Sequence, residues 1–461
     1  MTARRPGAPL AAPRVIAVRP AASIISAVVI LIAPRIAAPA PPSPALPARL
    51  TLDEALKIFR QSGLDLIIAE AAVEGAEGDL KAAGAVPNPA FGVSFSHVFT
   101  YNPGAMCESA TCSANGIGLD LNDQHAIEDT LAGKRGLRLR VANSGLEAAR
   151  QGRADAQRTL EFTVKQQYLQ AVLARDQLDF ALEVQKSLAA TFELMHLRYQ
   201  KGAISEADEA KVETAKLEAE QAVSAARRAL QVTKLGLAFL LGVRGQLPAF
   251  EVDADLPAFS VPGALAQATP ASLVAEAFDR RPDLKAQRAQ HARADAAVAL
   301  AKRLRFPDIA LDLNYQQAGS GGIGTNAPLT PPTLTVGLNA PLPLFYRQQG
   351  EIRKAESNLK LQDAQQAKIE AQVVSDVATA HANYAAAKDQ VERMQGRLLE
   401  RARRARDLVG IQYQKGAASL LELFDAERTY IATNVEYLND LAAYWIAVSQ
   451  VEQAVGVDLR K

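Results

Sequence analysis

The sequence has few aromatic residues, only five histidines, and almost no net charge. Its 461 residues include 51 basic and 50 acidic ones, and the resulting net charge of +1 offers no basic surface for nucleic acid. It contains no glycine-rich phosphate loop, no nucleophile elbow and no His/Cys cluster with metal-ligand spacing. We therefore expect no enzyme, no cofactor, no metal site and no nucleic-acid partner.

Long apolar runs are also missing, because no segment beyond the N-terminus has 18 consecutive apolar residues. The N-terminus has a basic region followed by the short apolar stretch Ala21–Ala33, which is typical of an export signal. We predict a signal peptide over 1–38 and a linker over 39–49; an uncleaved anchor helix is the alternative. An exported chain without a spanning helix is periplasmic, secreted or an outer-membrane barrel.

The chain repeats itself. Tyr199–Ala203 recurs as Tyr413–Ala417, and the same offset of 214 residues carries Ser205 onto Ser419. A shared offset indicates a tandem duplication. We predict a first repeat over 50–247, a proline-rich linker over 248–270 and a second repeat over 271–461. Each repeat should contain an opening helix, two strands and a long helical hairpin; the opening helices are predicted at Thr51–Ala85 and Ser272–Arg305.

Four short segments alternate apolar and small or polar residues. They are Phe91–Phe99, Ile117–Asn122, Ile309–Tyr315 and Leu334–Asn339. A period of two places one set of side chains on each face of a strand. Lipid outside and water inside a barrel would produce this pattern, and so would a half-exposed soluble sheet. Four strands cannot close a barrel, so a barrel would need several copies of the chain.

The two cysteines lie in the loop between the first pair of strands. In an oxidising compartment Cys107 and Cys112 are expected to form a disulfide. A two-cysteine metal site is the alternative, but no histidine or third cysteine lies nearby.

Proline is absent from two stretches of about 65 residues, Gly136–Gln200 and Gly350–Gln414. Each would form a helix roughly 100 Å long. Gly202 and Gly416 can end these helices in the left-handed conformation, and Ser205 and Ser419 can cap the returning helices. A coiled-coil spacer would share this geometry.

Together these features resemble the TolC-like outer-membrane efflux family over essentially all of Leu50–Val457. The marks of the resemblance are Pro87-Asn88-Pro89, Arg281-Pro282-Asp283-Leu284, Pro341-Leu342-Pro343-Leu344-Phe345, and the second tip, from Tyr413-Gln414-Lys415-Gly416 to Ser419-Leu420-Leu421-Glu422-Leu423-Phe424-Asp425-Ala426. Ala132–Arg135 and Phe345–Gly350 are most similar to the cobalt–zinc–cadmium (CzcC-type) heavy-metal efflux subgroup.

The resemblance implies a mostly α fold with a small β part. Three chains would form a homotrimer with a shared 12-stranded outer-membrane β-barrel, four strands from each chain, and a periplasmic α-helical barrel. Its implied partners are a periplasmic adaptor, an inner-membrane RND pump and outer-membrane lipid. The implied function is the outer-membrane duct of a tripartite efflux system, exporting heavy-metal cations. Multidrug efflux, type I protein secretion and an exported structural spacer are the alternatives.

The tips carry the predicted functional residues. The small residues Gly202, Ser205, Gly416 and Ser419 are expected to let an adaptor hairpin dock, although ordinary turn and cap chemistry would also explain them. In the resembling family, acids matching Glu422 and Asp425 line the periplasmic entrance, and an acid matching Asp208 helps to hold the tips closed. We predict a gate from these three; the alternative for Glu422 is a simple helix cap.

Overall fold

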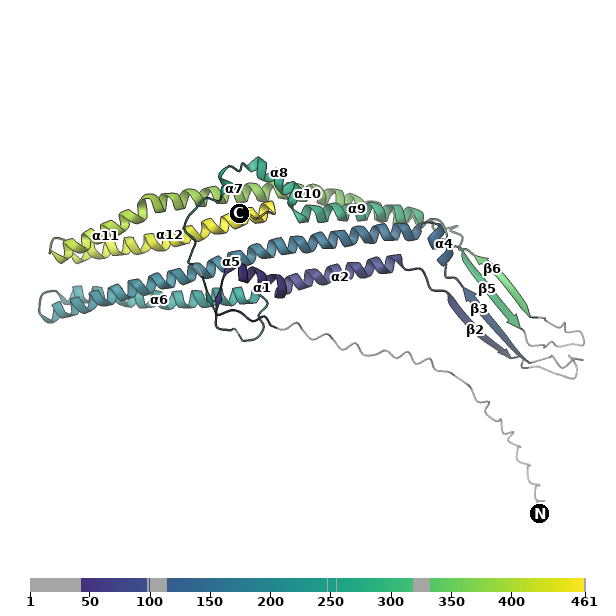
Figure 1. Cartoon of the computed structure of the whole chain (residues 1–461), viewed down its shortest axis with the longest axis horizontal. Helices are drawn as coiled ribbons and strands as arrows, with labels where there is room; N and C mark the ends of the chain where they lie inside the picture. The colour runs from purple at the N-terminus through teal and green to yellow at the C-terminus, as the bar shows by residue number, and fades with distance from the viewer. Residues whose placement is uncertain are drawn as a thin grey trace, which may run out of the picture. The chain divides into compact units, whose positions relative to one another are not determined.

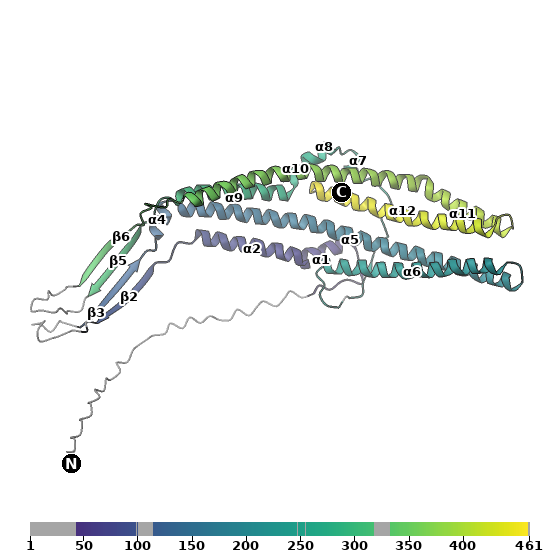
Figure 2. The ribbon, with the colours of Figure 1, turned by 180° about the vertical axis from the view of Figure 1, so that it is seen from behind.

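The computed structural model describes residues 43–97, 99, 114–246, 248–253, 255–317 and 332–459. Figures 1 and 2 show the ribbon from opposite sides, with a sheet at one end of the helices and helical hairpin tips at the other. The predicted mostly helical chain with a small β part is therefore confirmed. The predicted signal peptide lies outside the described residues.

The opening segment of each repeat is two helices, where we had predicted one. The first repeat has α1 (Leu52–Ser62) and α2 (Leu64–Gly84), and the second has α8 (Pro270–Arg280) and α9 (Pro282–Arg303). The breaks lie at Gly63 and Arg281, which have nearly the same backbone angles, with ψ of 121° and 123°. Pro282 explains the second break, because proline disfavours a helical conformation in the residue before it.

The long helices were predicted correctly, with one irregularity. Helix α5 runs over Lys134–Gln200 and returns as α6 (Glu206–Leu240). Its counterpart consists of α10 (Gln349–Arg393), a π-helical turn η1 (Met394–Leu398) and α11 (Leu399–Gln414), and returns as α12 (Leu420–Val455). The π-helical turn was not predicted, and it interrupts only the second of the two long helices.

The four predicted strands form one antiparallel sheet. They are β2 (Ala90–His97), β3 (Asn115–Asn122), β5 (Ala310–Gln317) and β6 (Thr333–Asn339), paired in the order β2-β3-β5-β6. The pairing of β3 with β5 joins the two repeats, and a short helix α4 (Ala126–Leu131) follows β3. Among the described strands, β2 and β6 each have a single neighbour, so both edges of the sheet are open.

The helices next to the sheet follow the same order as the strands. Helix α2 packs on α5, α5 on α9, and α9 on α10. Because α2 leads into β2, α5 follows β3, α9 leads into β5 and α10 follows β6, the four-strand layer continues as a four-helix layer (Figure 1).

The core lies where the repeats and the proline-rich segment meet. Strand β1 (Arg49–Leu50) pairs in parallel with β4 (Glu251–Val252), and a short helix α7 (Gly263–Ala266) follows. The buried Tyr444 donates its hydroxyl to the carbonyl of Ser260 at 2.7 Å, and Trp445 Nε1 donates to that of Pro257 at 2.8 Å. The segment between the repeats is thus packed against the second hairpin. The division at 50–247, 248–270 and 271–461 stays a prediction.

Candidate functional site

The first hairpin tip is a tight turn closed by a helix cap. Gly202 adopts a positive φ of 71°, which a glycine takes at little cost after a helix ends. Ser205 then accepts a hydrogen bond from the backbone N–H of Asp208 at 3.2 Å, and its hydroxyl donates to Asp208 Oδ2 at 2.9 Å. Lys211 Nζ lies 3.3 Å from Asp208 Oδ1. The carboxylate of Asp208 is therefore held by groups of its own helix turn.

The second tip repeats this turn and completes the cap. Gly416 has a φ of 73°. Ser419 accepts from the N–H of Glu422 at 3.2 Å, while Glu422 Oε2 accepts from the N–H of Ser419 at 2.7 Å and from its hydroxyl at 2.9 Å. This reciprocal arrangement is a full capping box. Within one chain, the Glu422 carboxylate therefore satisfies the start of α12.

Both caps favour ionised carboxylates. Hydrogen bonds from the backbone and then the hydroxyl of Ser419 lower the pKa of Glu422. The Ser205 hydroxyl, followed by Lys211, lowers the pKa of Asp208. Each carboxylate is charged at neutral pH, as a cation-attracting ring would require.

Asp425 lies one turn further along α12 and is exposed. Within the described residues its carboxylate has no hydrogen-bond or ion-pair partner, in contrast to Glu422 and Asp208. Residues three apart lie on one helix face, so Asp425 shares a face with Glu422. Of the three predicted gate residues, Asp425 is thus the one whose carboxylate is not engaged by hydrogen bonds or ion pairs of the tip.

Just before the tips, the two hairpins touch through residues that the sequence analysis did not select. Tyr413 donates its hydroxyl to Met195 Sδ at 3.3 Å, and Met195 is 1% exposed. The guanidinium of Arg198 lies 5.9 Å from the centre of the Tyr413 ring. Tyr413 belongs to the repeated tip sequence, but only the folded chain shows that it joins the first hairpin to the second.

A buried ionic cluster near the helix break of the second repeat was also missed as a site. Arg281, 3% exposed, donates to Asp283 at 2.6 Å, to Asp376 at 2.9 Å and to the carbonyl of Ala454 at 3.3 Å. Burial opposes the charge on Asp283, but the hydrogen bonds and charge of Arg281 outweigh burial and lower the pKa of Asp283. This cluster ties α9, α10 and α12 together.

Within the described residues, one face of the sheet is apolar and has no cover. Register places Phe91 opposite Leu121, Val93 opposite Leu119, and Phe95 opposite Ile117, while Leu311, Leu313 and Tyr315 face Leu338, Val336 and Leu334. Phe95 is 79% exposed, Leu338 is 76% exposed and Val336 is 64% exposed. The opposite face carries polar residues, among them Asp120, paired with Asn314, and Asn122, hydrogen-bonded to Asp312.

Other predicted features have different outcomes. Cys107 and Cys112 lie outside the described residues, so their disulfide stays a prediction. Over the described ranges, no group of three or more His, Cys, Asp or Glu side chains has the geometry of a metal site. Nor does any helix in those ranges combine the length and apolar character needed to cross a membrane.

Comparison with known proteins gives a family. The model of the outer membrane efflux protein family matches residues 56–243 and 273–457. The cobalt-zinc-cadmium resistance protein CzcC of Cupriavidus metallidurans is 23% identical, over 88% of this chain and 90% of its own length. The pyoverdine export outer membrane protein OpmQ of Pseudomonas putida is 27% identical, over 82% of this chain and 80% of its own.

Solved structures share the fold. CusC, described in terms of transmembrane channel formation, superposes with a TM-score of 0.70 at 19% identity, covering 88% of this chain and 92% of CusC. The outer-membrane channel OprN gives 0.70 at 20% identity, covering 89% and 91%. The expectation that the chain is no enzyme is confirmed, since its relatives are efflux channels. Matched over most of both repeats, the chain belongs to the outer membrane efflux protein family.

Proposed function

We propose that three copies of this chain form the outer-membrane duct of a tripartite efflux system, fed by a periplasmic adaptor and an inner-membrane RND pump. Each copy contributes four strands to a 12-stranded barrel in the outer membrane, and its hairpins build a tunnel in the periplasm. Residues 1–38 act as the export signal. The observation that carries the proposal is the uncovered apolar face of the sheet, on strands whose order is repeated by the long helices next to them.

The apolar face supports a lipid environment. Removing a large apolar side chain from water is worth about 1.5–3 kcal/mol, and the rows of the sheet hold side chains as exposed as Phe95 at 79% and Leu338 at 76%. In a soluble sheet these side chains would stay in water, and this stabilisation would be lost. In lipid, the open edges β2 and β6 must also be paired, and neighbouring copies can pair them head to tail in a closed ring.

The parallel order of strands and helices supports a tunnel below the barrel. A ring that joins β6 of one copy to β2 of the next also brings α10 of one copy beside α2 of the next, because each helix adjoins its strand. Closing the ring of strands would therefore also close a ring of helices below it.

Heavy-metal cations are the proposed cargo. The similarity to a cobalt-zinc-cadmium resistance protein over 88% of this chain supports this choice. The comparable similarity to a pyoverdine export protein makes an organic cargo the second candidate. A duct does not need to bind its cargo tightly, so the cargo is tested in cells.

The cargo test uses a deletion strain. We expect deletion to lower the tolerated concentration of cobalt, zinc or cadmium, and the wild-type gene to restore it. Siderophore export and drug tolerance are measured in the same strain. Unchanged metal tolerance with a loss of siderophore export or of drug tolerance would refute the metal cargo while leaving the duct intact.

The tips are proposed as the gate and the adaptor-docking site. Asp425, Glu422 and Asp208, repeated by threefold symmetry, would form acidic rings, a device that cation-selective pores use. Gly202, Ser205, Gly416 and Ser419 would let a partner hairpin approach closely.

Planar bilayers separate the gate from a simple cap. We expect Glu422→Ala with Asp425→Ala to change conductance, reduce cation selectivity and weaken block by multivalent cations. Ser419→Ala is the control, because it removes hydrogen bonds of the capping box but keeps both carboxylates. If the double variant conducts like the parent, Glu422 is only a cap and the gate proposal fails.

A further inference from the structure

We propose that a basic pocket at the sheet-side end of α9 and α10 binds the phosphate of an anionic phospholipid in the periplasmic leaflet of the outer membrane. This inference rests on the proposed location of the sheet in that membrane. It assigns a ligand to a part of the chain that neither the tips nor the apolar face explains.

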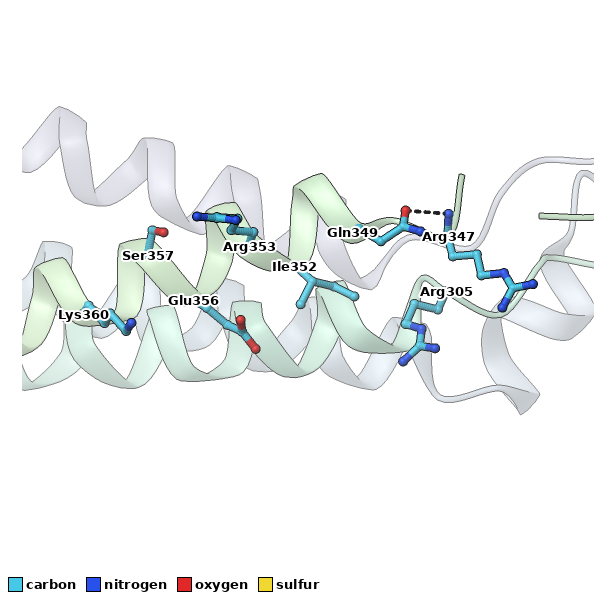
Figure 3. Close-up of a pocket in the computed structure, with 8 residues that line it drawn as sticks. All are labelled: Arg305, Arg347, Gln349, Ile352, Arg353, Glu356, Ser357 and Lys360. Atoms are coloured by element: carbon cyan, nitrogen blue, oxygen red, sulfur yellow. Dashed lines mark hydrogen bonds between the residues drawn. The ribbon is translucent and has the colours of Figure 1, made fainter. Parts of the chain in front are cut away.

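The pocket lies along the first turns of α10, beside the end of α9, with loops at one end of the view (Figure 3). It is an open hollow of about 710 Å³, a volume within the range of ligand sites. Arg305 follows the end of α9, Arg347 precedes α10, and both lie at the loop end of the view, while Ser357 and Lys360 lie at the far end on α10. The lining residues are Arg305, Arg347, Gln349, Ile352, Arg353, Glu356, Ser357 and Lys360.

The pocket has an excess of unpaired positive charge. Arg305, Arg347, Arg353 and Lys360 form no ion pair with any residue of the described ranges. The one lining carboxylate, Glu356, is engaged by Lys302 from α9 at 3.0 Å. Arginine is well suited to phosphate, because its planar fork can donate two parallel hydrogen bonds to phosphate oxygens.

Additional donors lie at the same place. The N-cap residue of α10, Gln348, makes no side-chain cap hydrogen bond, so the first N–H groups of this helix remain available to an anion. Ser357 adds a hydroxyl to the pocket wall. These donors supplement the four cations; alone they would not define a ligand.

Exposed apolar and aromatic side chains next to the pocket favour a phospholipid as the source of the phosphate. Between the end of β6 and Arg347 the chain exposes Leu342 at 73%, Leu344 at 68%, Phe345 at 98% and Tyr346 at 54%. Aromatic residues gather at the boundary between lipid tails and water, and basic residues reach the headgroups just beyond it. The chain passes from the apolar face of β6 through this belt to the cations, as it would on leaving a bilayer.

A free phosphate ion would leave the apolar belt, Leu342 and Leu344 to Tyr346, exposed to water. A neighbouring copy of the chain would contact the cations only as part of an interface between chains. A phospholipid uses both, because its acyl chains cover the belt and its phosphate meets the two arginines at the loop end of the pocket, Arg305 and Arg347. We therefore choose the lipid, and the experiment distinguishes it from the other two.

The test measures lipid binding to purified, delipidated oligomer by native mass spectrometry. Phosphatidylglycerol is titrated against wild type, against Arg305→Gln with Arg347→Gln, and against the control Arg401→Gln with Arg404→Gln. The control arginines are exposed on α11, away from the pocket. A basic residue beside anionic lipid contributes roughly a fivefold gain in affinity, so losing two should weaken binding roughly twenty-five-fold. The control should bind like the wild type.

Three outcomes would overturn the lipid site. Equal binding by the pocket and control variants would show that the pocket takes no lipid. Displacement of the lipid by inorganic phosphate would indicate a free-anion site, and dissociation of the pocket variant alone would indicate a seam between copies. The same spectra test the proposed function separately. A wild-type particle whose mass does not correspond to three chains would contradict the proposed duct.

Discussion

Replacing Arg281 by methionine should destabilise the chain through the two carboxylates it leaves behind. Arg281 is 3% exposed and holds Asp283 and Asp376, whose side chains are 21% and 33% exposed. Removing one member of a buried ion pair costs about 3–5 kcal/mol. Water can reach both acids in part, so we expect the low end, about 3 kcal/mol. Methionine keeps most of the buried length, so the loss reports on charge and hydrogen bonding.

The size of this effect can be expressed as a temperature. Unfolding entropy is about 2.1 cal/mol/K per residue, so over 461 residues a loss of 3 kcal/mol lowers the midpoint by about 3 °C. In an oligomer of three chains, the lost free energy and the unfolding entropy both triple, so the expected shift of the midpoint stays the same. The assay is the loss of helical circular dichroism in neutral detergent, at fixed protein concentration and scan rate.

The same variant should change the response to acid. Because the pKa of Asp283 is lowered in the folded chain, its contribution is present above the unfolded pKa of about 3.9 and is lost as pH falls through the folded value. Without Arg281, burial of Asp283 is opposed mainly by Arg158, whose guanidinium lies 3.9 Å from Asp283 Oδ2, so that pKa should be higher and acid unfolding should begin at higher pH. Arg281→Lys, which keeps a charge but not the fork, should fall between. An unchanged midpoint together with an unchanged acid limb would refute the reasoning.

Three further predictions follow from the sheet, the tips and the loop. Val336→Lys, on the apolar face, should cost about 2–4 kcal/mol near the middle of a bilayer and abolish outer-membrane assembly, whereas the neighbouring Thr335→Lys on the polar face should assemble; equal amounts in outer-membrane fractions would count against a lipid-facing surface. Ser419→Trp should abolish efflux while the oligomer survives, and Ser419→Ala should retain efflux, since docking depends on small size; resistance retained by Ser419→Trp would remove the docking proposal. Cys107 and Cys112 should resist thiol labelling until reduction, and two labelled thiols in unreduced outer-membrane protein would show that no disulfide forms.

The features that local chemistry determines were predictable from sequence. The left-handed Gly202 and Gly416 and the caps at Ser205 and Ser419 follow from residues within a few positions, and the structure has them as expected. The strands were also predictable, because their alternation is a property of each segment alone. The break at Arg281 could also have been predicted, because Pro282 disfavours a helical conformation in the residue before it.

Contacts between distant segments were not predictable. Tyr413 meets Met195 because the two hairpins pack side by side, and Arg281 meets Asp376 because α8 and α9 pack on α10. The proline-rich segment was predicted as a linker, yet its carbonyls at Pro257 and Ser260 accept hydrogen bonds from α12. Proline content marks where a helix cannot form, but it does not say which side chains will find the carbonyls it leaves free.

The closed ring of three chains is the central claim, and the mass of the particle extracted from outer membranes tests it most directly. Light scattering with a correction for bound detergent should give three chains per particle for the wild type. A particle of one chain, or a chain recovered only from the soluble fraction, would contradict the proposed duct.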